Sequence, residues 1–149
     1  MHAASSERFL VRHGMVMFLA GLLMGVAIPQ VTNPRMMLGA HTGTLMTGTF
    51  LIVTGLAWKH VLLAPTLERV GVRVLAFSSW GISAALVWAA ILGTSRSTPI
   101  MGAGYAGSPW AETVADVVLT VSSVALLAAV VIVVRGLFGQ GADVLPSEG

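Results

Sequence analysis

Residues 117–134 read VVLTVSSVALLAAVVIVV, a stretch of 18 residues without Asp, Glu, Lys or Arg. A helix that crosses the hydrocarbon core of a membrane needs about 20 predominantly apolar residues. Because a backbone in lipid has to satisfy its own hydrogen bonds, a single apolar run of this length can span the membrane only as a helix. The stretch therefore predicts a transmembrane helix over roughly 114–135.

Three further stretches, each of 22 or 23 residues, also lack these four residue types. The chain of 149 residues is 56% hydrophobic and only 9% charged, which is typical of integral membrane proteins. The predicted spans are 13–30, 38–58, 70–92 and 114–135. We therefore expect an all-α fold with one domain over 1–149, an up-down-up-down four-helix transmembrane bundle, followed by a flexible tail at 139–149.

The basic residues are distributed unequally between the two ends of these spans. The N-terminus, the second loop and the C-terminal region carry six of them, and the first and third loops carry two, Arg35 and Arg96. By the positive-inside rule, both termini are expected in the cytoplasm, and the protein in the cytoplasmic (inner) membrane. The net charge of +2 comes from bases flanking the membrane and does not indicate nucleic acid. With no cysteine, thiolate ligands and disulfides are excluded.

A histidine stands inside the second span, in the segment GAHTGTLMTG (39–48). At 3.6 residues per turn, His41, Thr44, Gly48 and Gly55 fall along one side of the helix. Such a smooth face would accept a flat cofactor, with the imidazole as its ligand. The alternative is a histidine that bonds to a neighbouring carbonyl and glycines that serve helix packing alone. The residues themselves leave both interpretations open.

Two other histidines, His13 and His60, stand at the cytoplasmic ends of the first two spans, as interface residues do, whereas His41 lies towards the other side of the membrane. His41 and His60 are 19 residues apart on one helix, which is about 28 Å at 1.5 Å per residue. His13 should differ from His41 in depth by roughly 20 Å in a core of about 30 Å. Neither can therefore share a haem iron with His41. If His41 binds a haem iron, the sixth coordination position of the iron is then free of histidine. A free position favours chemistry at the iron over electron transfer.

The fourth span and the loop before it carry further polar candidates. Asp116 forms a polar stripe with Glu112, Thr120 and Ser123, and it would be placed to orient a substrate group. Alternatively, it is a carboxylate near a helix N-terminus, where the helix dipole favours it. Tyr105, the only tyrosine, lies in the glycine-rich third loop. It would cap a pocket or donate a proton there, or serve as an ordinary interface residue.

Small and aromatic residues mark the first and third spans. Gly21 and Gly25 form a small-xxx-small pair, which allows another helix to approach closely, within the chain or between chains. Trp80 and Trp88 would suit an arene pocket, although packing alone also explains them.

Several stretches together resemble a known family of small membrane isomerases, which includes hydroxylaminobenzene mutase and, more distantly, styrene oxide isomerase. The similarity extends over nearly the whole chain. The stretches that carry it are RHGMVMFLAGLLMGVAIP (12–29), NPRMMLGAHTGTLMTGTFLIVTGLAW (33–58), the region of Trp80, and TPIMGAGYAGSPWAE (98–112).

The resemblance implies a four-helix fold, a homotrimer and a haem b near the subunit interfaces, with His41 as its iron ligand. Thr44 and Gly48 are then expected beside the cofactor, and Thr47, Tyr105 and Asp116 are the catalytic candidates.

This chain also departs from its relatives. Thr47 stands where relatives carry asparagine. Ser78 and Leu86 stand where the epoxide isomerase branch has Asp and Tyr, which argues against epoxide isomerisation.

The resemblance favours a haem-dependent mutase that acts on a small aromatic substrate. Ferric iron held by His41 would act as a Lewis acid on an arylhydroxylamine, whose hydroxyl would move to the ring and give a 2-aminophenol. No net electrons move, in agreement with the lack of a nucleotide-binding fingerprint. The alternatives are an epoxide isomerase of the styrene oxide type, a non-catalytic haem protein, and a small exporter that depends on Asp116. The expected partners are this substrate, the lipid bilayer and two further copies, with no nucleic acid.

Overall fold

The computed structural model describes residues 3–139, so the predicted tail lies, from residue 140 onward, outside the described residues. Within them the chain is helical and contains no strand. The long helices are α1 (Ala3–Ala27), α2 (Pro34–Leu56), α3 (Pro65–Leu92) and α4 (Pro109–Phe138), with short 3-10 turns η1 (Ile28–Gln30) and η2 (Trp58–His60). All four are long and apolar enough to cross a membrane. The all-α fold and the four spans are therefore confirmed, and the protein is a multi-pass membrane protein.

The helices extend beyond the charge-free stretches that predicted them. α1 begins at Ala3 and continues through Arg8 and Arg12, because a helix can extend into the polar interface once its apolar part has crossed the membrane. It ends at Ala27, where the turn η1 contains a proline. α2, α3 and α4 each begin at a proline. Proline suits the first helical position, because its missing N–H would have no partner there.

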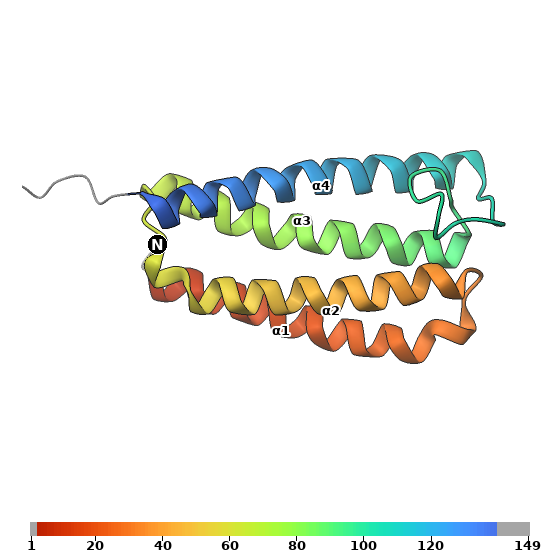
Figure 1. Cartoon of the computed structure of the whole chain (residues 1–149), viewed down its shortest axis with the longest axis horizontal. Helices are drawn as coiled ribbons and strands as arrows, with labels where there is room; N and C mark the ends of the chain where they lie inside the picture. Colours follow the sequence, from red (N-terminus) through yellow and green to blue (C-terminus); the bar gives the residue numbers. More distant parts are fainter. Residues whose placement is uncertain (1–2, 140–149) are drawn as a thin grey trace, which may run out of the picture.

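The four helices lie side by side along one long axis, with consecutive helices joined at alternate ends (Figure 1). α1 packs on α2, α3 packs on α4, and α2 also contacts α3. We call the end with residues 28–33 and 93–108 the loop end. The opposite end, with η2, the start of α1 and the end of α4, is the terminal end.

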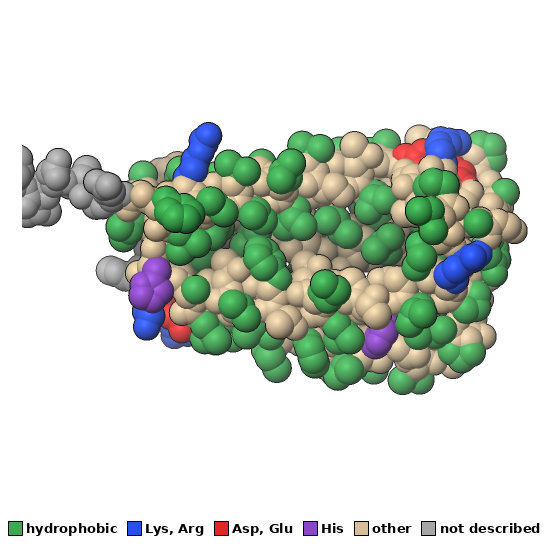
Figure 2. Space-filling model, viewed as in Figure 1, with side chains coloured by type: hydrophobic (Ala, Val, Ile, Leu, Met, Phe, Trp, Pro, Cys, Tyr) green, Lys and Arg blue, Asp and Glu red, His purple; other side chains and the backbone are tan. Residues whose placement is uncertain are grey.

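The interior contains two apolar clusters, one towards each end of the bundle. The larger cluster, towards the terminal end, includes Leu10, Met17, Leu51, Trp58 and Leu75. The smaller cluster, near the loop end, consists of Met36, Met37, Ala40, Ala89 and Ala90. Outside, Figure 2 shows charged side chains gathered at the two ends and apolar side chains over the flank between them. An apolar belt of this extent is suited to lipid rather than to water.

Asn33 ties three segments together at the loop end. It is fully buried, and as N-cap of α2 its Oδ1 accepts a hydrogen bond from the Met36 N–H at 3.0 Å. Its Nδ2 donates to the carbonyl of Met101 at 3.0 Å. Its backbone N–H donates to the carbonyl of Ala90 at 2.9 Å. One side chain therefore caps α2 and holds the third loop.

Replacing Asn33 with Ala should lower the free energy of unfolding by about 1–2 kcal/mol, because one cap and one loop hydrogen bond are lost. Denaturation of the purified protein in mixed micelles, followed by far-UV circular dichroism, measures this. Ser108→Ala is the matched control, since Ser108 is the N-cap of α4 but its side chain makes no capping bond. Equal effects of the two changes would contradict the role of Asn33.

Candidate functional site

His41 lies two turns into α2, half-buried where α2 contacts α1. Its Nδ1 is 2.7 Å from the carbonyl oxygen of Gly21 on α1. Because a carbonyl oxygen only accepts, this contact requires a proton on Nδ1, and Nε2 is the ring nitrogen that can present a lone pair. Nε2 has no hydrogen-bond partner in the described part of the chain. A ligating histidine is held in this way, with one ring nitrogen fixed by a carbonyl and the other free for a metal.

The glycine pair of α1 makes room for this side chain. A Cβ added at Gly25 would lie 2.9 Å from Cε1 and 3.0 Å from Nδ1 of His41. A Cβ added at Gly21 would lie 2.8 Å from Cδ2 of Leu45. The small-xxx-small pair therefore acts within the chain, where it receives two side chains of α2 and presents the Gly21 carbonyl to the imidazole.

Two glycines of α2, Gly48 and Gly55, pack against α1. A Cβ at Gly48 would lie 2.9 Å from both the Gly14 carbonyl oxygen and the Phe18 backbone nitrogen. A Cβ at Gly55 would lie 3.1 Å from the Glu7 carbonyl oxygen. There is consequently no room for a flat cofactor against Gly48, and the predicted cofactor contact there is replaced by helix packing. A group bound by His41 has to lie outside this contact.

The threonines of α2 differ in how their hydroxyls are paired. Thr47, a predicted catalytic residue, donates to the Gly43 carbonyl of its own helix at 2.8 Å. Thr42 and Thr49 likewise donate to carbonyls one turn before them. Thr44 is 1% exposed, and its hydroxyl is the one buried side-chain polar atom without a partner among the described residues. Thr44 lies one turn from His41.

Asp116 belongs to a network that holds the third loop. Its carboxylate forms an ion pair with Arg96 at 3.0 Å and accepts a hydrogen bond from the Ser97 hydroxyl. α4 packs mainly on α3, whereas His41 lies between α1 and α2. The structure therefore places Asp116 and His41 in different helix pairs of one chain.

Glu112 is the polar residue whose importance the sequence did not reveal. It is 6% exposed, and its carboxylate accepts hydrogen bonds from three backbone N–H groups. The donors are Ser95, Arg96 and Gly107, each at 3.0 Å. A glutamate in the first turn of an apolar helix was the only signal, and it does not reveal that the loop folds back onto the carboxylate.

Tyr105 lies in the same loop and is half-buried. It packs beside Gly93, where a Cβ would lie 3.8 Å from Cβ of Tyr105. Gly93 ends α3 with a φ of 68°, in the left-handed region that favours glycine. The phenol has no hydrogen-bond partner within residues 3–139, so it remains available to a ligand or a neighbouring molecule.

The other two histidines named from the sequence lie elsewhere. His60 is exposed in η2 at the terminal end. His13 accepts a hydrogen bond at Nδ1 from the indole N–H of Trp80, at 3.2 Å. Among the described residues no three His, Cys, Asp or Glu side chains stand close enough to hold a metal ion together.

Comparison with known proteins supports the resemblance drawn from the sequence. The family model described as styrene oxide isomerase matches residues 6–138. The chain is 28% identical over 135 residues to hydroxylaminobenzene mutase HabA of Ectopseudomonas oleovorans, covering 88% of this chain and 98% of that protein. It is 27% identical over 142 residues to hydroxylaminobenzene mutase HabB of the same organism, covering 92% and 87%.

Proposed function

The chain belongs to the styrene oxide isomerase family, and we propose that it is a membrane-embedded mutase that converts an arylhydroxylamine into a 2-aminophenol. The reaction class rests on the family and on its similarity to two hydroxylaminobenzene mutases over most of its length. The observation that carries the proposal to a residue is the imidazole of His41, with its Nδ1–H held by Gly21 and its Nε2 free.

The residues around His41 fit a haem b. Nε2 would bind the iron. The carbonyl of Gly21 would orient the ring and make Nε2 a stronger electron-pair donor to the metal. When bound, a ferric haem would supply a Lewis acid towards the hydroxylamino group. The absence of a cluster of metal ligands among the described residues suits a cofactor that needs only one protein ligand.

The proposed reaction is balanced without an external reductant or oxidant. The N–O bond of the arylhydroxylamine breaks, a C–O bond forms at the ortho carbon, and the ring proton at that carbon moves to nitrogen. The chain contributes an apolar, helical surrounding that keeps water from a reactive arene intermediate. Of the three catalytic candidates, Tyr105 is the best supported, because its phenol has no hydrogen-bond partner within residues 3–139. The hydroxyl of Thr47 and the carboxylate of Asp116 are already paired within the chain.

Membrane orientation and assembly are part of the proposal. Within residues 3–139 the terminal end carries six basic and two acidic side chains, and the loop end carries two of each. We propose that the terminal end faces the cytoplasm of a cell whose inner membrane holds the protein. We also propose a homotrimer, as the resemblance to the isomerase family implies, in which a neighbouring chain would bring a second wall to His41.

The second candidate is epoxide isomerisation, which the name of the matched family model favours. This chain has Ser78 at the position where the epoxide isomerase branch carries Asp. Its hydroxyl donates to the Val74 carbonyl of its own helix at 2.6 Å. A polar group for an epoxide is therefore lacking at this position, and the mutase remains the better-supported function.

The test is haem content and activity in the detergent-purified protein. We expect one haem b per chain, absent in His41→Ala, and isomerisation of phenylhydroxylamine to 2-aminophenol that is lost with the haem. His60→Ala is the matched control, because His60 is exposed at the other end and should leave both unchanged. In His41→Gly, added imidazole should restore the absorption spectrum.

Three outcomes would decide otherwise. Full haem occupancy in His41→Ala would refute the ligand assignment. Turnover of phenylhydroxylamine by haem-free protein would refute the cofactor. Turnover of styrene oxide but not of phenylhydroxylamine would assign the chain to the epoxide branch.

A further inference from the structure

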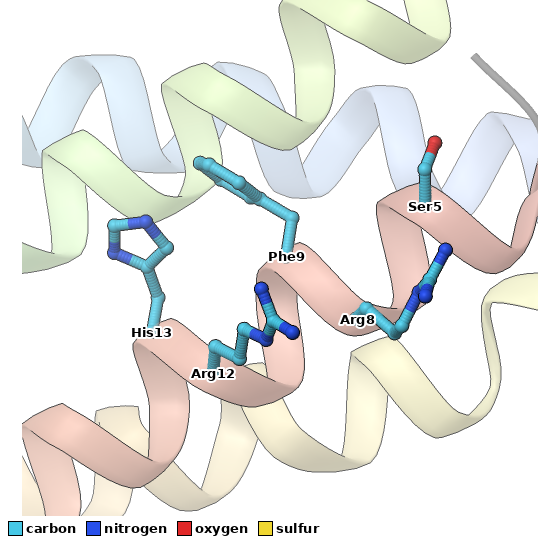
Figure 3. Close-up of a pocket in the computed structure, with 5 residues that line it drawn as sticks. All are labelled: Ser5, Arg8, Phe9, Arg12 and His13. Atoms are coloured by element: carbon cyan, nitrogen blue, oxygen red, sulfur yellow. The ribbon is translucent and has the colours of Figure 1, made fainter.

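One face of α1 lines a groove of about 490 Å³ at the terminal end. The residues on this face are spaced so that they recur once per helical turn. Figure 3 shows their side chains rising from the same side of α1, with Phe9 and His13 directed towards α3. The residues that line the groove are Ser5, Arg8, Phe9, Arg12 and His13.

Within residues 3–139, neither arginine of this groove forms an ion pair with an acidic side chain. Arg8 and Arg12 are exposed and one turn apart. Within the described residues the only ion pair is that of Arg96 with Asp116, at the opposite end of the bundle. Like charges at this spacing destabilise a helix unless an anion lies between them. Guanidinium groups present planar sets of N–H donors that match the oxygens of a phosphate.

The groove has an aromatic floor. The rings of Phe9 and His13 have their centroids 4.3 Å apart. His13 is held in place by the indole N–H of Trp80, which donates to its Nδ1. The basic site is therefore backed by a fixed apolar wall that continues from α1 onto α3.

This wall continues towards the middle of the membrane. A second hollow of about 230 Å³ is lined by Arg12, His13, Val16 and Trp80. A third, of about 300 Å³, shares Trp80 and extends to Met24 on α1 and Ile91 on α3. From Arg12 to Met24 the path along α1 is about 18 Å at 1.5 Å per residue. This is close to the depth of one leaflet, since the hydrocarbon core is about 30 Å thick.

We propose that this groove between α1 and α3 binds an anionic phospholipid. Its phosphate lies between Arg8 and Arg12, and one acyl chain runs past Val16 and Trp80. A free phosphate ester would share the headgroup chemistry but would leave the apolar part of the groove unfilled.

A second copy of the chain fits the basic site less well. In a membrane oligomer, neighbouring copies lie at the same depth, so the terminal end of one copy faces the terminal end of the next. That end carries six basic and two acidic side chains within residues 3–139. One of the two acids, Glu68, already accepts hydrogen bonds from Ser6 and Trp58. A neighbour would thus oppose Arg8 and Arg12 with like charge.

The test measures binding of phosphatidylglycerol and phosphatidylcholine with identical acyl chains to the delipidated full-length protein by native mass spectrometry. We expect phosphatidylglycerol to bind preferentially, and Arg8→Gln with Arg12→Gln to weaken its binding about thirty-fold. Arg69→Gln with Arg135→Gln is the matched control, because both residues are exposed at the same end and line neither the groove nor its continuation. Exposed charges that do not line the groove are screened by salt, so the control should lose less than about threefold.

A groove-filling variant tests the acyl chain separately. Val16 is 57% exposed, so Val16→Trp should fold normally. It should weaken phosphatidylglycerol binding about tenfold while both arginines remain. Equal binding of the two lipids, or an equal loss in the control, would overturn the proposal. Glycerol phosphate binding as tightly as phosphatidylglycerol would indicate a soluble anion instead. Dissociation of an oligomer by Val16→Trp with unchanged lipid binding would make the groove a subunit contact.

Discussion

Glu112→Ala is expected to lower the free energy of unfolding by about 2–3 kcal/mol, because it leaves three part-buried N–H groups without their acceptor. Those groups belong to Ser95, Arg96 and Gly107. They bring both halves of the third loop onto the start of α4, so the loop should detach when the carboxylate is removed. Denaturation in mixed micelles measures the stability.

Glu112→Gln should also be strongly destabilising, because the amide keeps one acceptor oxygen and turns an NH₂ group towards backbone donors. Asp116→Asn is the matched control. Asp116 is a neighbouring acid on α4, but its partner Arg96 is 58% exposed, and pairs of this kind contribute about 0–1 kcal/mol. If Glu112→Ala cost no more than Asp116→Asn, the loop would not depend on the buried carboxylate.

Gly48→Leu is expected to force α1 and α2 apart and to cost about 3 kcal/mol or more, or to prevent folding altogether. Even a Cβ at this position would lie 2.9 Å from the Gly14 carbonyl oxygen and from the Phe18 backbone nitrogen. Backbone atoms of a packed helix cannot move aside as a flexible side chain can. Because the imidazole of His41 is held by Gly21 across the same helix contact, retention of the proposed haem should fall together with stability.

Alanine variants keep this prediction testable if the leucine variant fails to fold. Gly48→Ala should cost about 1–3 kcal/mol. Gly43→Ala, five residues earlier in α2, meets no atom within 4 Å. It should stabilise the helix by about 0.5–1 kcal/mol, because alanine has the higher helix propensity. Opposite signs for the two substitutions in the same denaturation experiment are the expected result, and equal signs would contradict the close helix contact.

The sequence around His41 predicted the candidate site only in part. The segment around it indicated a possible ligand, but packing was an equally valid interpretation of the same glycines. The structure shows the contacts of the packing interpretation, and the ligand role of His41 stays a proposal. Gly48 packs against Gly14, while His41 is held by Gly21 with its Nε2 free. A helical stripe shows which residues share a face, and it does not show which neighbouring helix covers that face.

The sequence by itself determined the four membrane-spanning helices, because an apolar run long enough to cross lipid is a local property of the chain. Through the matching stretches it also indicated the isomerase family. The tertiary structure alone decided which groups meet: the Gly21 carbonyl with His41, the third loop with Glu112, and Trp80 with His13. The contact of His41 with Gly21 joins residues 20 positions apart, and that of Trp80 with His13 joins residues 67 positions apart. Both depend on how each helix is rotated against its neighbours.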